Sequence, residues 1–316
     1  MEFDPNYYFY LIFFNLILAG FVSSQIVVKA CNFKMNTNIF NVSQEVGSTN
    51  RDIVFLYATK PNPGLIISIS SLRGTGCQCR IILFTPSNFE FTRFLVHFFI
   101  KKNVEVVFNA DDKLKRSYAP HMLRYEYELE WLQKHKKEVD KILHSDSLDV
   151  FFQGDPFTSI ISNDSLIFIV EPQCIRSCGW NLAWANECYG PIGLRTLKNN
   201  FIICSGSISG PSNEYIKLLT LMIDQNEWKT CWGPSHDQPI LNHIIWNDIA
   251  KMNGIKYKLS GCGGGFFTMQ WCVLEKKVLY NEHNQIISNE GSVPSYIHQY
   301  NRYPNLTRKL FEIYVN

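Results

Sequence analysis

The sequence predicts an α/β fold in which helices flank a mostly parallel central sheet, followed by an irregular C-terminal half. Three observations predict it. Short apolar runs alternate with helix-length segments between residues 51 and 145. Two carboxylates directly follow the fourth of these runs, and ligands bind beyond the carboxyl ends of parallel strands. With 316 residues, 46% of them hydrophobic and 14% aromatic, the chain can build one large domain or two small ones with a proper core.

Strand-length apolar runs define the first half of the predicted sheet. They are Ile53–Ala58, Arg80–Phe84, Val104–Phe108 and Lys141–Leu143. The segments between them have the length and spacing of helices, and Asn62-Pro63 is a helix start signal. These helices are expected at Leu65–Leu72, ending near Gly74, at Asn88–Lys101 and at Ser117–Lys137. The alternation of strands and helices implies a parallel sheet with right-handed crossovers.

The second half of the chain is less regular. We expect strands at Ser165–Val170 and Phe201–Cys204, and a helix from Pro211 to Gln225. A further helix should begin after His236-Asp237-Gln238. The glycine-rich segment Gly261–Gly265 lacks a following Lys-Ser/Thr, so it is no phosphate-binding P-loop, and we expect a hairpin turn there.

The acidic segment after the fourth strand is the strongest chemical signal in the chain. Asp146 and Asp149 would point to opposite faces of a straight strand, because strand side chains alternate. They converge only if the chain turns directly after Asp146 or winds briefly into a helix. The turn is the better fit, because Lys141-Ile142-Leu143 has the pattern of a strand and Ser147 suits a turn. Paired carboxylates are what a hard divalent cation needs. The alternative is a solvated loop in which Asp146 caps a short helix.

The N-terminus predicts a leader. Residues 7–22 are apolar and uncharged but shorter than the roughly 20 residues that span a bilayer, and Ser23-Ser24 suits signal cleavage. An uncleaved anchor and a buried core helix are the alternatives, and the flanking charges decide nothing. We therefore divide the chain into a signal peptide or signal anchor (1–24), a stem (25–50) and one catalytic domain (51–316).

Other features favour the secretory route. Asn41, Asn163 and Asn305 each begin an Asn-x-Ser/Thr glycosylation triplet. Ten cysteines suit an oxidising lumen, and their spacings match no paired CxxC zinc site, so disulfides are favoured over free buried thiols. A net charge of only +2 gives no reason to expect a nucleic-acid partner.

Five segments occur in the order found in one enzyme family. They are Ser71-Leu72-Arg73-Gly74-Thr75-Gly76, the acidic segment Asp146–Phe157 preceded by Arg124, Cys204-Ser205-Gly206-Ser207-Ile208-Ser209-Gly210, His236-Asp237-Gln238 with Asn242, and His298-Gln299-Tyr300-Asn301-Arg302. Over most of residues 51–303 the chain thereby resembles the GT-A superfamily of nucleotide-sugar glycosyltransferases. The closest pattern is that of a eukaryotic branch with Asp-x-x-Asp, two hydrophobic residues, Phe-Gln-x-Asp-Pro-Phe, distantly similar to glycogenin.

The resemblance implies a Rossmann-like GT-A fold and a donor site. Ala58 and Thr59 would line the nucleobase pocket, and Arg124 and Asp146 would contact the nucleotide. Asp146, Asp149 and His298 would hold Mn²⁺ or Mg²⁺, leaving coordination positions for two diphosphate oxygens. Without its flanking Gln-Tyr-x-Arg, His298 would be taken for an ordinary loop histidine.

The resemblance also implies sugar and acceptor contacts. Ser205 and Gly206 lie where relatives carry Asn-Ser-Gly or Asn-Ala-Gly, but Cys204 replaces the Asn, which puts an amide role in doubt; a simple bend between strands is the alternative. Asp237 and Gln238 resemble the Asp-Gln pair of retaining enzymes, although Asp237 would serve as general base in an inverting enzyme and could instead be a helix N-cap.

An aromatic and amide-rich stretch lies between the halves of the domain. It comprises Glu171, Trp180, Asn181, Trp184 and Asn186. Within it, Trp184 and Asn186 are the expected sugar or acceptor contacts, because sugars stack on rings and hydrogen-bond to amides. The alternative is that the two tryptophans pack in the core.

The sequence thus predicts a luminal glycosyltransferase of the Golgi or endoplasmic reticulum. It would transfer a sugar from a UDP-linked donor to a glycan or glycoprotein acceptor, with retention of the anomeric configuration. It would contact the membrane only through its N-terminal segment. The alternatives are a non-catalytic nucleotide-sugar- or glycan-binding secreted protein, a nucleotidyltransferase, and a disulfide-rich adhesion protein. A nucleotidyltransferase would carry a Gly-rich basic loop after the first strand, and Ala58-Thr59-Lys60-Pro61 does not resemble one.

Overall fold

The computed structural model describes residues 41–42, 45–109, 118–158 and 161–315. The expected leader and most of the expected stem lie outside these residues. The end of the stem contacts the domain, because Ser48 is buried and its hydroxyl donates to Asp155 at 2.6 Å. Within the described residues, none of the helices combines the length and apolar character that a bilayer crossing requires.

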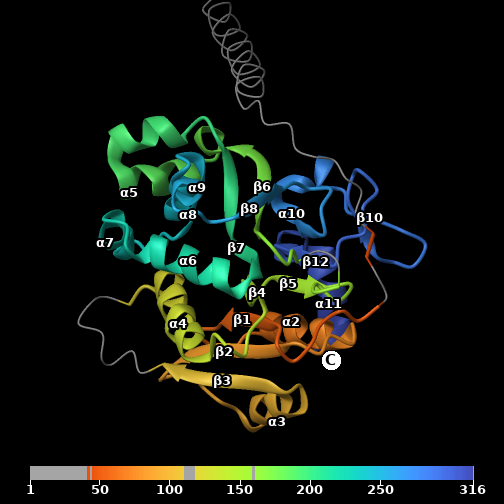
Figure 1. Ribbon diagram of the computed structural model, residues 1–316. Helices are drawn as coiled ribbons and strands as arrows, with labels where there is room; N and C mark the ends of the chain where they lie inside the picture. The colour runs from red at the N-terminus through yellow and green to blue at the C-terminus, as the bar shows by residue number, and fades with distance from the viewer. Residues whose placement is uncertain (1–40, 43–44, 110–117, 159–160, 316) are drawn as a thin grey trace, which may run out of the picture.

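A seven-stranded sheet forms the centre of the molecule (Figure 1). Its strand order is β3-β2-β1-β4-β7-β6-β8, and every neighbouring pair is parallel except the two that involve β7. The predicted mixed α/β fold with a mostly parallel sheet is confirmed. The strands are β1 (Ile53–Tyr57), β2 (Arg80–Pro86), β3 (Val104–Asn109), β4 (Lys141–Ser145), β6 (Leu166–Cys174), β7 (Phe201–Pro211) and β8 (Tyr257–Ser260).

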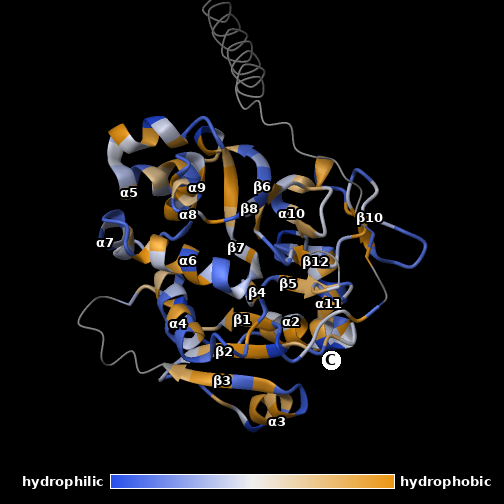
Figure 2. Ribbon diagram, in the orientation of Figure 1, coloured by the Kyte–Doolittle hydropathy of each residue, from blue (hydrophilic) through white to orange (hydrophobic). Residues whose placement is uncertain are grey.

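Helices cover both faces of this sheet. Alternate residues of β1 point to opposite faces, so Ile53 and Phe55 join one core cluster while Val54 and Leu56 join another. The first cluster contains α4 (Pro120–His135), α6 (Ser212–Ile223) and α8 (Gln238–Trp246), and the second contains α2 (Pro63–Gly74) and α3 (Arg93–Lys101). Figure 2 shows apolar residues concentrated on the central strands β1 and β2.

A second, three-stranded sheet lies beside the first. Its order is β5-β12-β9, with β5 (Val150–Phe152), β9 (Phe266–Thr268) and β12 (Tyr296–His298). The remaining elements are η2 (Ile175–Ser177), α5 (Gly179–Leu197), α7 (Glu227–Trp232), α9 (Ile249–Met252), α10 (Met269–Cys272), η3 (Leu274–Lys276), β10 (Leu279–Tyr280), β11 (Ile286–Ile287), η4 (Tyr300–Arg302) and α11 (Pro304–Tyr314). The C-terminal α11 returns to pack against α2 (Figure 1).

Local signals explain several element boundaries. Asn62 caps α2, because its side chain accepts a hydrogen bond from the Gly64 amide at 2.7 Å. The helix expected from Asn88 begins only at Arg93, since Thr92 is its N-cap. The long α5 is kinked at Gly190, where φ is +64°, just before Pro191.

The expected hairpin at Gly261–Gly265 is wrong. A turn does form, with the Gly264 amide donating to Gly261 at 3.0 Å. However, it joins β8 to β9, which belong to different sheets and do not pair. Glycines predict a tight turn but carry no information about which strands pair on either side of it.

Substitution of Gly64 tests the contact between α2 and the acidic segment. A Cβ at this position would lie 1.8 Å from the Leu148 carbonyl oxygen, between the two aspartates in sequence. We expect Gly64→Ala to destabilise the fold by about 1–3 kcal/mol, because helix and turn must move apart. Chemical denaturation measures this. Gly74→Ala in the same helix meets nothing within 4 Å and is the control; equal stability of the two variants would contradict the packing.

Candidate functional site

The chain turns directly after Asp146, which is the favoured of the two ways in which the two aspartates can converge. The Asp146 amide donates to the Gly206 carbonyl at 2.8 Å, which extends the pairing of β4 with β7 by one bond. The Ser147 hydroxyl then donates to the Tyr57 carbonyl at 2.6 Å, at the carboxyl end of β1. Asp149 follows, directly before β5. The acidic turn therefore lies at the carboxyl ends of two parallel strands.

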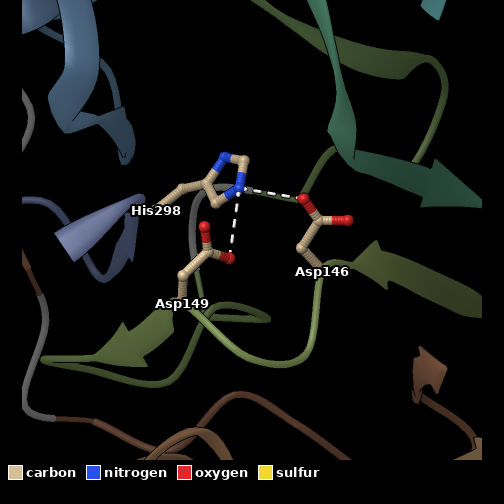
Figure 3. A group of neighbouring side chains, drawn as sticks. All are labelled: Asp146, Asp149 and His298. Atoms are coloured by element: carbon tan, nitrogen blue, oxygen red, sulfur yellow. Dashed lines mark hydrogen bonds and ion pairs between the residues drawn. The ribbon is translucent and has the colours of Figure 1, made fainter. Parts of the chain in front are cut away.

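Strand pairing brings His298 to the same place. In the antiparallel pair β5–β12, His298 lies opposite Val150, the residue after Asp149. The Gln299 amide donates to the Asp149 carbonyl at 2.8 Å and continues this pairing. His298 Nε2 is 3.1 Å from Asp146 Oδ2 and 3.6 Å from Asp149 Oδ1 (Figure 3).

These three side chains form a candidate metal site. One donor atom from each lies within 4.8 Å of the others, and Figure 3 shows the imidazole facing both carboxylates. Two carboxylate oxygens and one imidazole nitrogen suit Mn²⁺, and Mg²⁺ with its preference for oxygen would also fit. The donor set and its convergence thus fit a divalent cation with open positions for another ligand.

The groups around His298 fix its orientation. Its Nδ1 is 3.6 Å from the Cys204 sulfur, and burial raises the pKa of that thiol. Gly206 lies against the other side, where an added Cβ would fall 2.4 Å from Asp146 Oδ2 and 2.6 Å from His298 Cε1. The Cys-Ser-Gly segment therefore packs against the two side chains themselves. A ligating histidine is oriented in this way by the partner of its second nitrogen.

Arg124 joins the acidic turn to the start of α8. Its buried guanidinium pairs with Asp146 Oδ1 through one nitrogen and with Asp237 Oδ2, at 2.6 Å, through the other. Burial alone would raise the pKa of both carboxyls. The charge and hydrogen bond of Arg124, together with His298 at Asp146 and His121 at Asp237, outweigh burial and lower the pKa of each carboxyl. Both aspartates are accordingly held in the ionised form.

Asp237 combines the two roles that the sequence left open. It is the N-cap of α8, where its Oδ1 accepts from the Gln238 amide at 2.9 Å. Its Oδ2 accepts from Arg124 and from the Tyr125 hydroxyl at 3.0 Å. A general base needs a free lone pair and a pKa near the working pH. Both oxygens of Asp237 already accept hydrogen bonds, and its pKa lies below its ordinary value, so this geometry disfavours proton abstraction by Asp237.

Gln238 links the site to the helix α5. Its Oε1 accepts from the Ser205 amide at 3.0 Å, and its Nε2 donates to Asn181 Oδ1 at 2.6 Å. Asn242, one turn later, holds both backbone groups of Ile203 on β7. Predicted motif residues from three separate segments therefore form one hydrogen-bonded unit.

A cavity of about 1260 Å³ opens over this unit. Eight predicted site residues line it: Arg124, Asp146, Trp184, Ser205, Gly206, Asp237, Gln238 and His298. Asp149 lies beside them, with 18% of its side chain exposed. Glu171, Trp180 and Asn181 of the aromatic stretch also line the cavity.

Three predicted contacts lie elsewhere. Ala58 and Thr59 follow the carboxyl end of β1 as expected but are not among the lining residues; Ala58 is buried and its amide donates to Phe84. Asn186 is exposed on α5 and does not line the cavity. Two residues along a helix are about 200° apart, so Asn186 cannot share the face of Trp184.

Part of the cavity lining is not predicted by the sequence. It includes Trp271, Lys276 and Tyr280, which come from α10, η3 and β10. These short elements lack the periodicity that sequence reading depends on. Tyr125, which contacts Asp237, was missed as well, and only its position next to Arg124 could have pointed to it.

The cysteines agree in part with the expected disulfides. Cys188 is bonded to Cys231 and Cys262 to Cys272, and Cys174 is also disulfide-bonded. Cys77, Cys79, Cys178 and Cys204 are free and buried. All three glycosylation-triplet asparagines are exposed. These features are compatible with a secreted or luminal protein.

No protein-family model matches the chain, and no curated protein is significantly similar to it. Neither comparison names an activity, so the function has to be argued from the residues of the site.

Gly206→Ala should impair metal binding more than folding. The added Cβ meets the Asp146 carboxylate and the His298 ring, so the donor atoms must separate. We expect Mn²⁺ affinity, measured by calorimetry, to fall at least tenfold, in the range found when a supporting group is lost. Gly233→Ala meets nothing within 4 Å and should bind as the wild type does. Unchanged affinity in Gly206→Ala would contradict the proposed site.

Glu171 should make folding stability depend on pH. Burial raises its pKa to about 7, from 4.5. Between these pH values the unfolded chain loses the proton and the folded chain keeps it, so stability falls as pH rises through this window, by roughly 3 kcal/mol. Glu171→Gln should remove this fall in unfolding free energies measured from pH 4.5 to 7.5, whereas Glu312→Gln on the exposed face of α11 should keep it. The same pH dependence in Glu171→Gln and wild type would contradict the assignment.

Proposed function

We propose that this protein is a metal-dependent glycosyltransferase of the GT-A type. It would transfer a sugar from a UDP-linked donor to a glycan or glycoprotein acceptor in the lumen of the secretory pathway. The observation that carries the proposal is the convergence of Asp146, Asp149 and His298 at the carboxyl edge of the parallel strands, beside the 1260 Å³ cavity. This is where ligands bind in open α/β sheets.

The charges around the cavity suit a diphosphate. A divalent cation bound at the three side chains would act as a Lewis acid and neutralise charge on the departing nucleoside diphosphate. Lys276 and Arg302 also line the cavity and add positive charge to it. Arg124 is occupied by two aspartates, so its part is to hold Asp146 in place.

The state of Asp237 favours retention of configuration. In the transfer, the acceptor oxygen forms a bond to the anomeric carbon while the bond from that carbon to the diphosphate breaks. Because both oxygens of Asp237 are hydrogen-bonded, the leaving diphosphate is the better acceptor for the hydroxyl proton. Asp237 and Gln238 then position the sugar and the β7 segment, consistent with the retaining enzymes that the motif resembles.

The position of the acidic turn argues against an adhesion protein. An adhesion role would leave the two aspartates open to solvent, but Asp146 lines the cavity and only 33% of its side chain is exposed. A non-catalytic nucleotide-sugar-binding protein would share this geometry. A measurement of donor turnover distinguishes such a binding protein from an enzyme.

The test is a screen of nucleotide sugars with Mn²⁺ that measures released nucleoside diphosphate. We expect release from a UDP-sugar, and we expect Asp149→Asn to lower it by more than the roughly 10–100-fold that loss of an outer partner costs. Asp224→Asn, an exposed aspartate at the end of α6, should leave release unchanged.

Two outcomes would overturn the proposal. Release that persists in Asp149→Asn would refute the metal role. Binding of UDP without release from any donor would make the protein a binding protein.

A further inference from the structure

Flat rings follow one another along the wall of the cavity. Trp180 and Trp184 are four residues apart on α5 and so share a face of the helix. Their ring centroids are 6.4 Å apart, and the next ring, that of His236, is 5.3 Å from Trp184. All three residues line the cavity. We call them the α5 aromatic strip; it ends at the residue before Asp237.

The strip is held rigidly against the reactive part of the site. His236 Nε2 is 2.9 Å from Glu187 Oε2 on α5, and the Cys188–Cys231 disulfide joins α5 to α7. Asn181, next to Trp180, bonds to Gln238. A ligand on the strip would therefore lie in a fixed position relative to Gln238.

Core packing does not explain the position of Trp180. The alternative expected for the two tryptophans was burial in the core, but 71% of the Trp180 surface is exposed. A large exposed aromatic ring that lines a cavity is typical of a binding surface. Core packing is therefore wrong for Trp180.

We propose that the α5 aromatic strip binds the sugar rings of a neutral glycan acceptor at least two units long. This inference rests on the proposed function and names its acceptor class. The apolar C–H faces of sugars stack on aromatic rings, while the Asn181 and Gln270 amides in the same cavity can bond to hydroxyls. Two of the three rings are tryptophans, which carry no charge, and His236 Nε2 lies 2.9 Å from Glu187 Oε2, so the strip suits a neutral sugar. The two successive distances between ring centroids, 6.4 Å and 5.3 Å, together exceed the width of one sugar ring.

The test uses the donor identified by the nucleotide-sugar screen and a panel of neutral oligosaccharides of two to six units, with free monosaccharides and peptides for comparison. We expect neutral oligosaccharides to be the preferred acceptors. Trp180→Ala should raise the acceptor KM about tenfold, which corresponds to one lost ring contact. The donor KM and donor hydrolysis without acceptor should stay unchanged, and Trp180→Phe should retain most of the affinity.

Ile192→Ala is the matched control, because Ile192 lies on the same helix, is 79% exposed and does not line the cavity. An unchanged acceptor KM in Trp180→Ala, or preferential transfer to peptides, would overturn the inference.

Quenching of tryptophan fluorescence by the same oligosaccharides tests the strip without turnover. If the wild type releases no nucleoside diphosphate from any donor, the proposed function fails, and loss of quenching in Trp180→Ala still supports glycan binding at the strip. Equal quenching in the wild type and Trp180→Ala would overturn it.

Discussion

The paired contact of Arg124 with Asp146 and Asp237 is the interaction on which the site depends. Three aspartates meet at one edge of the sheet, where their side chains are largely buried and unpaired charge is costly. The guanidinium lies between two of them and keeps both ionised. Because Arg124 comes from α4 and Asp237 from the start of α8, the same contact also joins two helices on one face of the sheet. Arg124 therefore both compensates the charge of two aspartates and holds α4 against α8.

Both sheets contribute residues to the candidate metal site. Parallel strands deliver Asp146, but Asp149 lies after a turn and His298 comes from the far end of the chain. The register of β5 with β12 brings the last two together. A shift of one residue in that register would turn His298 to the other face. Gly206 leaves the space that the carboxylate and the imidazole occupy. The candidate metal site is thus a consequence of strand pairing between segments far apart in sequence.

The elements that could be predicted from the sequence are those with a periodic apolar pattern or a local chemical signal. Alternating apolar runs predicted β1 to β4, and Ser147 predicted the turn that lets two aspartates converge. His298 could be assigned only through its flanking motif, since no local pattern announces a pairing between β5 and β12. The wall formed by Trp271 and Lys276 comes from elements too short to show a period. Asn186 lies outside the cavity because composition alone does not show which face of a helix a residue occupies. The hairpin at Gly261–Gly265 fails because a turn does not reveal which strands pair beside it.

The central claim is that these three side chains hold a cation that in turn binds a nucleoside diphosphate. Calorimetric titration of UDP into the wild-type protein, with Mn²⁺ and then with chelator, tests it most directly. The account predicts binding with a stoichiometry of one that requires the metal. Equal UDP binding in the presence and absence of Mn²⁺, or no binding in either, would contradict it.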